Sequence, residues 1–556
     1  MTFRAVIAGD RIDAYENDST PRLFSGAGAA IVGFCGAGFI AFWAYSKAVN
    51  LLLQSGSVTS TALLSGILAL SGIGLGYRQW PVSFSILLRG IIIVFLFYAA
   101  AATSNVTSGA QGSDAETLIA QISLFHYAAL ASGCIALIRP TFALPLLLYV
   151  FATKFGLGDF FGFPISSTDY IIVMEFGQFV VLSILILYWA LFLTGRFRAF
   201  AVVHTTIRQQ SIRIVSFIVL MGIAAHFANY FWSAHEKLIL DGGVTSWVLE
   251  NPTHYLILNS KELGLLPLLI SDWLTDLVFW QFGNIVVAAN IFTLTIQLLS
   301  VVALWRWRWV VWLTLLYDVM HVVIFLTTGI FFWKWIVLNT LVIIAIRRSR
   351  PEQLGPAFHG LACCFVLFAE LLFTIAHLGW YDTNAVNHVY FEAITEDRKS
   401  YEVPTNYFLA ASITAAQQRV GRAVGDVLPT GGLGITKQLD MVKSTEQCER
   451  RLLKGGLADP DNRPGSKDQL AEFLRNHHAY ILSRVDENGR FEYDLYPHHI
   501  WSNPMVFNEF RQLDKRRIVA YRWVVDGVCF DIGEGKVDRR VLGRFEEVIG
   551  LDSARY

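Results

Sequence analysis

Three consecutive ionisable side chains, His235, Glu236 and Lys237, end a strongly apolar segment of this 556-residue chain. A lysine at the edge of a low-dielectric region is readily made a base at neutral pH, because desolvation favours its uncharged form. Lys237 also lies on one helical stripe with His226 and Tyr230, at positions i, i+4 and i+11. We therefore predict that Lys237 is a catalytic base.

Further ionisable side chains interrupt other apolar segments. Inserting a charged side chain at the centre of a bilayer costs about 2.5 to 3.5 kcal/mol, so each of these residues is a candidate functional residue. The helical rise of about 1.5 Å per residue places most of them in the outer half of the membrane. A cavity open to the outer side would explain them together, whereas a single buried histidine or aspartate is more often a packing residue. The residues are His126, Glu175, His226, Asp318, His321, Glu370 and His377.

The residue types favour proton transfer. Asp318 or Glu370 would orient a neighbouring histidine and select its tautomer, while His226 and His321 carry protons or bind a substrate carbonyl. No i, i+4 pair of histidines supports a metal site, so none is predicted. Catalytic roles are assigned to Lys237, His321, Asp318 and His226. Contacts with a cofactor are assigned to Tyr230, His126, Glu175, Glu370 and His377.

Composition places most of this chain in a membrane. Hydrophobic residues make up 54% and charged residues 16%, against about 25% charged in an average soluble protein. The 44 basic and 44 acidic residues balance, and no sustained basic stripe suggests nucleic acid as a partner. We expect the lipid bilayer to be a principal partner.

Eleven apolar segments are long enough to suggest membrane crossings. Residues 240–283 are too interrupted for a clean span and favour re-entrant or interfacial helices. The prediction is a polytopic α-helical membrane protein with a C-terminal extracytoplasmic α+β domain, divided as 1–23, 24–379 and 380–556. The segments are 24–46, 59–77, 83–103, 116–138, 140–156, 169–194, 213–234, 284–304, 309–328, 330–346 and 357–378.

Arginine sets the predicted orientation. With a cytoplasmic N-terminus, loops on that side collect arginines such as Arg78, Arg139 and Arg196, and the opposite side carries few basic residues. An odd number of crossings places the tail outside the cytoplasm, in a plasma membrane such as the bacterial inner membrane. Cys448 and Cys529 then face an oxidising space and could form a disulfide.

The residue pattern of the C-terminal tail predicts an α+β fold. Strands are expected at 389–395, 490–501 and 516–533, and helices at 406–424 and 468–482, with a flexible stretch at 455–467. Adjacent histidines point to different sides of an element, so His477–His478 and His498–His499 are expected at the surface. The motif HHIWSNP at 498–504 has no evident chemistry.

The stretch YFWSAHEKL at 230–238, together with Trp247, YDVMHVVIF at 317–325 and IFFWKW at 330–335, resembles a known membrane family. This is the vitamin K-dependent gamma-carboxylase-like, or HTTM, family, and the resemblance covers mainly residues 210–346. It implies a reduced quinone of the vitamin K type as cofactor, Lys237 as the base that deprotonates it, and His321 near the quinone. A large domain after the last span agrees with the predicted topology.

One departure separates this chain from the carboxylases. Glu236 stands where they carry a first lysine, and a carboxylate beside the base would favour its charged form. Two other functions stay open. One is a non-catalytic membrane scaffold or lipid-binding subunit whose tail recruits an extracytoplasmic protein partner. The other is a transporter, although no internal repeat supports it.

Overall fold

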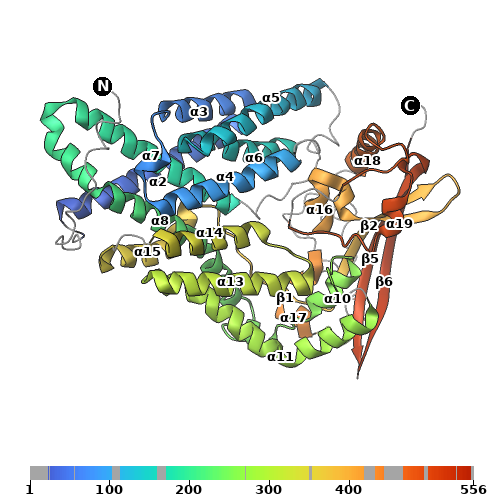
Figure 1. The fold of residues 1–556 in the computed structure, drawn as a ribbon. Helices are drawn as coiled ribbons and strands as arrows, with labels where there is room; N and C mark the ends of the chain where they lie inside the picture. The colour runs from blue at the N-terminus through green and yellow to red at the C-terminus, as the bar shows by residue number, and fades with distance from the viewer. Residues whose placement is uncertain are drawn as a thin grey trace.

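The computed structural model describes residues 23, 25–55, 57–102, 113–158, 171–268, 271–349, 354–418, 432–443, 467–493, 499–533 and 535–551. Figure 1 shows a large bundle of helices with a smaller sheet-containing region at one end, where the C-terminal strands lie. The long helices of the bundle run broadly along the same direction as one another. The chain therefore has a helical part and a C-terminal sheet region, as predicted.

A helix occurs at each of the eleven apolar segments. Ser25 caps the first, since its Oγ accepts a hydrogen bond from Gly28 N. Short helices α9 (Ser246–Glu250), α10 (Tyr255–Glu262) and α12 (Ser300–Ala303) lie between the longer ones. The longer helices are α2 (Gly26–Gln54), α3 (Val58–Ser71), α4 (Val82–Ala102), α5 (Ser113–Ala136), α6 (Ala143–Gly158), α7 (Ile171–Arg196), α8 (Ala201–Leu238), α11 (Asp272–Leu298), α13 (Trp307–Thr328), α14 (Trp333–Ser349) and α15 (Pro356–Phe368).

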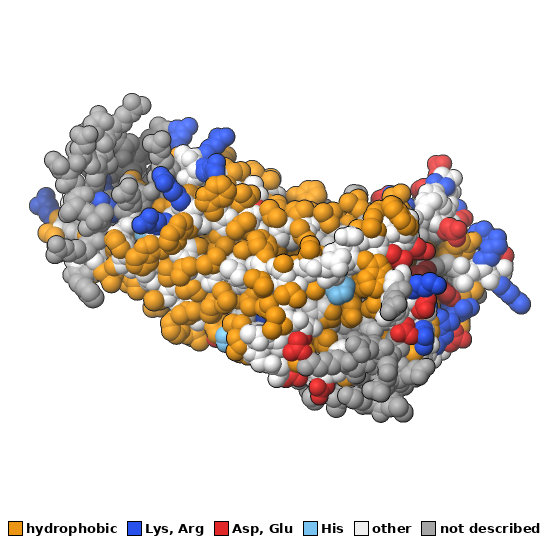
Figure 2. Space-filling view, turned by 90° about the horizontal axis from the view of Figure 1, so that it is seen from below, with side chains coloured by type: hydrophobic (Ala, Val, Ile, Leu, Met, Phe, Trp, Pro, Cys, Tyr) orange, Lys and Arg blue, Asp and Glu red, His pale blue; other side chains and the backbone are white. Residues whose placement is uncertain are grey.

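Six helices in the described residues are long and apolar enough to cross a membrane. Three shorter apolar helices, beginning at Val58, Pro140 and Pro356, accompany them. Figure 2 shows a broad hydrophobic band on one face, with Lys and Arg side chains at one end and mixed charges at the other. Such a band is what membrane insertion requires. The six candidate segments are Gly26–Leu53, Val82–Ala100, Ile171–Arg196, Arg198–Leu238, Asp272–Leu298 and Trp307–Thr328.

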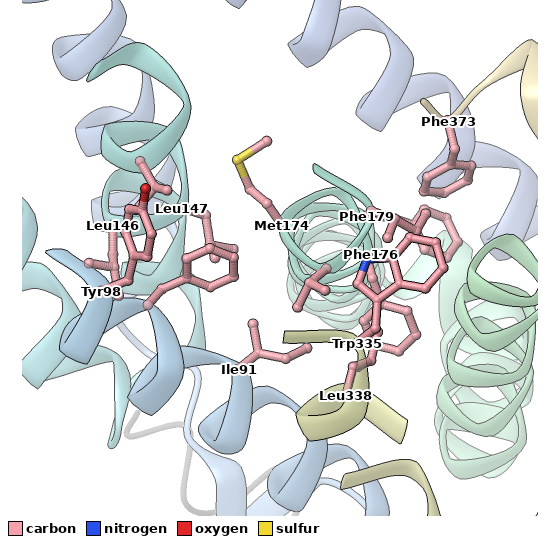
Figure 3. Close-up of a cluster of buried hydrophobic side chains, with 14 of the residues drawn as sticks. Ile91, Tyr98, Leu146, Leu147, Met174, Phe176, Phe179, Trp335, Leu338 and Phe373 are labelled. Atoms are coloured by element: carbon pink, nitrogen blue, oxygen red, sulfur yellow. The ribbon is translucent and has the colours of Figure 1, made fainter. Parts of the chain in front are cut away.

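The centre of the bundle is apolar and aromatic. Ile91 of α4, Leu147 of α6, Phe176 and Phe179 of α7 and Trp335 of α14 meet there, as the close-up in Figure 3 shows. Each of these side chains except Trp335, which is 3% exposed, is at most 1% exposed. Dispersion contacts in such a closely packed interior fix the helices that carry the polar side chains described below.

The C-terminal region is built on a four-stranded antiparallel sheet in the order β3-β2-β5-β6. Helix α18 (Lys467–Leu482) packs beside it, where His478 Nδ1 lies 3.1 Å from Tyr521 Oη. A two-stranded sheet, β1-β4, joins the region to the bundle. The strands are β1 (Tyr381–Asp382), β2 (Ala385–Thr395), β3 (Ser400–Val403), β4 (Ile435–Thr436), β5 (Ile518–Gly533) and β6 (Lys536–Gly550). Short helices 405–411, α16 (Ser412–Ala416), α17 (Leu439–Lys443) and α19 (Asn508–Gln512) complete it.

The turn between α13 and α14 docks the C-terminal region. Ile330 pairs with Ile500 in an antiparallel bridge, and Phe331 N donates to the His499 carbonyl oxygen at 2.6 Å. Gly329 begins the turn with φ +71°, and a Cβ there would lie 2.0 Å from the Leu265 carbonyl oxygen. Only glycine fits this backbone at such a close approach.

Several expectations for the helices need correction. Residues 357–378 do not form one helix, because α15 ends at Phe368 and residues 374–380 have no regular secondary structure. Glu370 and His377 therefore do not share a helical face. The interrupted segment 240–283 is not wholly re-entrant, since its last part belongs to α11, which begins at Asp272.

The tail was predicted in part. The strand at 389–395, the helix at 468–482 and the strand at 516–533 are confirmed as β2, α18 and β5. The described residues of 490–501 contain no strand beyond the Ile500 bridge, and β6 was missed. The surface prediction for histidines was wrong, because His477, His478 and His499 are 1%, 2% and 6% exposed. His498 and the stretch 455–466 lie outside the described residues.

Candidate functional site

A polar cluster lies inside the bundle where α8, α13 and α14 meet. We call His226, Tyr230, Asp318, His321 and Asn339 the deep cluster. All except Asp318 are at most 2% exposed, and Asp318 is partly exposed. The sequence predicted four of these residues, and the structure brings those four together. Asn339, which joins them, was missed because an asparagine in an apolar segment carries no charge to draw attention.

Asn339 connects the deep cluster through both atoms of its amide. Its Nδ2 donates to Asp318 Oδ1 at 2.8 Å and to Tyr230 Oη at 3.2 Å, and its Oδ1 lies 2.8 Å from His226 Nε2. A carboxylate only accepts hydrogen bonds, so the contact with Asp318 fixes which amide atom is nitrogen. Asn339 Oδ1 therefore faces His226, and the Nε2–H of His226 is the donor.

This arrangement sets the tautomer of His226. In a neutral imidazole with a proton on Nε2, Nδ1 carries a lone pair and can accept a proton. His226 Nδ1 is buried and has no hydrogen-bond partner, and the same holds for His321 Nδ1. Buried nitrogen atoms without partners are uncommon in folded proteins and call for an explanation. The deep cluster thus offers unused hydrogen-bonding capacity in a buried environment.

Aromatic rings enclose the two histidines. The Tyr230 ring stacks on Tyr317 with centroids 3.6 Å apart and lies 5.8 Å from His321. The Trp335 ring is 5.7 Å from both His226 and His321. Such rings suit a flat, apolar ligand and exclude water from the nitrogen atoms.

Lys237 lies about three helical turns from His226, in a second group at the C-terminal end of α8. Its Nζ donates to the carbonyl oxygens of Leu378 (2.6 Å) and Ser233 (3.0 Å) and to Gln297 Oε1 (3.2 Å). The Trp247 ring lies 5.1 Å from the same atom. Three oxygen acceptors saturate an ammonium group, which has three donors. Lys237 thus contacts none of the deep cluster.

Residues 374–380, which we call the strap, have no regular secondary structure and run past α8. Glu175 accepts from Thr374 N and Thr374 Oγ1, both at 2.8 Å, and Asn229 Oδ1 accepts from Ala376 N at 2.9 Å. Ser233 Oγ donates to the Ala376 carbonyl oxygen at 3.1 Å. Asn229, Ser233 and Lys237 are spaced by four residues on one face of α8. These three hold the strap by its backbone, and we call them, with Gln297 as the further acceptor of Lys237, the rim cluster.

The remaining predicted site residues lie elsewhere. His377, on the strap, has Nδ1 3.4 Å from Glu236 Oε1 and Nε2 3.8 Å from Glu370 Oε2. Glu236 thus has His377 and Lys437 as its ion-pair partners, and its carboxylate remains near enough to act on the charge of Lys237. His126 packs near Tyr149 of α6, with ring centroids 5.5 Å apart. The structure does not gather the predicted residues into one cavity.

Asp382 adds a buried carboxyl group beside the rim cluster, outside the membrane-spanning segments. Its Oδ2 accepts from Asn251 Nδ2 at 3.0 Å, and its backbone N donates to Asn251 Oδ1 at 2.7 Å. Burial raises the pKa of Asp382 to about 7, although Asn251, Trp380 and nearby Lys237 oppose that shift. The sequence offered no signal for Asp382, which follows the last apolar segment.

The sheet region holds a separate charged group. Glu262 accepts from Arg539 through Nε (2.7 Å) and Nη2 (2.6 Å), and His388 Nδ1 lies 3.0 Å from it. Partial burial would raise the pKa of Glu262, yet its hydrogen bonds to Arg539 and His388 lower that pKa to about 2. This group ties α10 to strands β2 and β6. Among the described residues, no group of three or more His, Cys, Asp or Glu side chains could hold a metal ion.

Four of the five described cysteines, Cys35, Cys134, Cys363 and Cys364, are free, and the fifth, Cys529, is disulfide-bonded. Cys448, its predicted partner, lies outside the described residues. Comparison of the chain with protein-family models, curated proteins and solved structures found no match. Function must therefore be argued from the geometry of the site itself.

Proposed function

We propose that this chain is an integral membrane enzyme that performs proton transfer on a hydrophobic ligand bound at the deep cluster. The ligand class is a quinone, a quinol or another flat lipid with a carbonyl or hydroxyl group. The observation that carries the proposal is the chain Asp318–Asn339–His226, which leaves His226 Nδ1 as a buried acceptor without a partner. A positioned base in a water-excluded site contributes about 10²- to 10⁴-fold to a proton transfer.

In this mechanism each residue has a distinct task. Asp318 orients Asn339, whose amide oxygen holds His226 with its proton on Nε2. His226 Nδ1 accepts the proton of a ligand hydroxyl, or returns it to a carbonyl oxygen. His321 supplies a second hydrogen-bonding nitrogen, and the rings of Tyr230 and Trp335 cover the ligand.

Lys237 remains a candidate base, as the resemblance to the gamma-carboxylases implies, with a condition set by its contacts. An amine accepts a proton through its lone pair, which is absent while Nζ donates to three oxygens. Lys237 can act as a base only after the Leu378 contact opens. Carboxylation of glutamate, the reaction of the gamma-carboxylases, is one specific reaction that this proposal includes.

The proposed topology has eleven crossings, a cytoplasmic N-terminus and a C-terminal region outside the cytoplasm, in a plasma membrane such as the bacterial inner membrane. The end of the molecule rich in Lys and Arg in Figure 2 lies away from the sheet region, in line with the rule that positive loops stay inside. The disulfide at Cys529 also fits an oxidising compartment.

A direct test uses a quinol carrying a decyl chain, bound to the purified protein in lipid nanodiscs. Formation of the quinol anion is followed by its ultraviolet absorbance. We expect the wild-type protein to promote ionisation and His226→Phe to abolish it. His254→Phe is the matched control, because His254 Nδ1 is also buried without a partner but lies outside the deep cluster. Equal ionisation in all three proteins would refute an acid–base site here.

A second candidate function is a membrane scaffold whose C-terminal region recruits an extracytoplasmic protein. It is favoured by β6, a long strand at the edge of the sheet whose side chains are largely exposed. Edge strands of this kind can pair with a strand of a partner. Recovery of one stable partner from both wild type and His226→Phe would support the scaffold over the enzyme.

A further inference from the structure

The outer end of the bundle is covered above the deep cluster. The strap is fixed to α7 and α8 through Glu175, Asn229 and Lys237. A second cover comes from the C-terminal region, which bonds to the turn at Ile330 and Phe331. A ligand arriving from the outer aqueous side would have to displace one of these covers.

The turn brings this second cover into contact with the cluster itself. The His499 ring stacks on Phe332 with centroids 5.7 Å apart, and Phe332 lies 5.3 Å from the His321 ring. Asn503 continues the attachment, donating from Nδ2 to the Leu266 carbonyl oxygen at 2.7 Å. The motif HHIWSNP, whose role the sequence left open, supplies these contacts from His499 onward.

The flank of α13 offers a different route. Asp318 is partly exposed, and its neighbours on the same face, Leu315 and Val322, are 42% and 44% exposed. Exposed apolar side chains in the middle of a spanning helix are expected to face lipid tails. A carboxyl group among them is costly unless it has a function or a polar partner.

One carboxylate oxygen of Asp318 can accept a hydrogen bond from a ligand. Its Oδ1 accepts from Asn339, and within the described residues no hydrogen bond reaches Oδ2. A carboxylate can accept several hydrogen bonds. Oδ2 is therefore available to a donor that approaches along the flank of α13.

From these contacts we infer that the ligand enters the deep cluster sideways from the bilayer, beside Asp318, and that it is a lipid-dissolved molecule with a hydroxyl donor. The hydroxyl first donates to Asp318 Oδ2, and its apolar body occupies the flank near Leu315 and Val322. This route rests on the proposed function for its destination, the acceptor nitrogen of His226. It differs from a cavity open to the outer solution, which the sequence predicted.

The first experiment blocks the flank. The probe is a phenol with a decyl chain and a diazirine, used to photolabel the protein in nanodiscs, with labelled peptides mapped by mass spectrometry. We expect labelling near Asp318 to fall at least tenfold in Val322→Trp. Val323→Trp is the control, because Val323 is also 44% exposed but points about 140° away from Asp318 around the helix. Equal labelling in the two variants would overturn lateral entry.

The second experiment locks the second cover, in which the C-terminal region is bonded to the turn at Ile330. Ile330 and Ile500 are bridge partners, a spacing that suits a disulfide, so Ile330→Cys combined with Ile500→Cys can be joined by oxidation. Lateral entry predicts the same rate of labelling in the oxidised and reduced forms. Loss of labelling on oxidation, restored by reduction, would show entry from the outer side and contradict the inference.

Photolabelling and quinol ionisation test the entry route and the proton transfer separately. Photolabelling reports arrival of the phenol and needs no proton transfer, whereas quinol ionisation reports the base. Labelling that responds to Val322→Trp while His226→Phe leaves ionisation intact would reject the base and keep the route. The reverse pattern would reject the route and keep the base.

Discussion

The deep cluster and the rim cluster are polar groups that both include residues of α8, yet they differ in how completely their hydrogen bonds are satisfied. At the rim, Lys237 has three oxygen acceptors, and Asn229 and Ser233 bond to the backbone of the strap. In the deep cluster, two histidine nitrogens have no partner. A fully bonded group holds the protein together, and a group with unused capacity is available to a ligand. Charge alone, which drew attention to Lys237 in the sequence, does not distinguish the two.

The largest effect is expected in the deep cluster. His321→Ala removes one of the two unpartnered nitrogens and the ring that faces Tyr230 and Trp335. We expect affinity for a decyl-quinone to fall by about tenfold to a hundredfold, a loss of roughly 1.4 to 2.8 kcal/mol. Isothermal titration in nanodiscs measures this. His126→Ala, a histidine outside both clusters, should bind normally, and equal losses in the two variants would deny the deep cluster a special role.

Lys237→Met tests the rim cluster as a clamp. The variant leaves the Leu378 carbonyl oxygen and Gln297 Oε1 without their donor, which costs about 1 to 3 kcal/mol for a buried group. Thermal unfolding should therefore begin at a lower temperature, and protease should cut the strap sooner. Quinone affinity should stay within about threefold of wild type. Normal stability with abolished turnover would instead identify Lys237 as the base. The rim cluster, and not the deep cluster, would then be the reacting site.

Gly329→Ala tests whether the attachment of the C-terminal region to the turn can be loosened without replacing a residue of either cluster. The added Cβ would meet the Leu265 carbonyl oxygen, and the backbone has positive φ, so strain of about 1 to 3 kcal/mol is expected. Proteolysis between the bundle and the C-terminal region should accelerate, whereas Gly33→Ala, where a Cβ meets nothing within 4 Å, should behave as wild type. Lateral entry further predicts that the labelling rate at Asp318 does not change.

The smallest effect concerns pH at the rim. Burial raises the pKa of Asp382 from 3.8 to about 7, so between these values the folded state binds more protons than the unfolded state. Stability then falls as pH rises through this window and levels off above it. From pH 6 to pH 8 the expected loss is about 1 kcal/mol. Asp382→Asn should flatten this slope in thermal unfolding, and an unchanged slope would mean that another group titrates.

The sequence predicted the helical part of the fold well, for a physical reason. Apolar segments near 20 residues are dictated by bilayer thickness, so a helix lies at each predicted segment. The end of the last one was misplaced because LFTIAHLG is apolar enough for a span, yet side chains from α7 and α8 bind its backbone in a non-helical form. Such tertiary hydrogen bonds leave no local signal.

The sequence identified most residues of the candidate site, but it did not predict how they are grouped in space. Helical spacing identified His226, Tyr230, Asp318 and His321, which do meet. It could not find Asn339, since an uncharged amide gives no charge signal, nor separate Lys237 from the others, since both groups share one stripe on α8. That separation depends on what each side chain bonds to: the partner of His226 lies on α14, and partners of Lys237 lie on α11 and the strap.

The most direct test compares two buried asparagines. Asn339 and Asn229 are 0% and 1% exposed and belong to the deep cluster and the rim cluster respectively. Small molecules extracted from wild-type protein, Asn339→Leu and Asn229→Leu are quantified by mass spectrometry. The account predicts a hydrophobic carbonyl or hydroxyl compound in wild type and Asn229→Leu, and its loss from Asn339→Leu. Retention by Asn339→Leu with loss from Asn229→Leu would contradict it and move the ligand site to the rim.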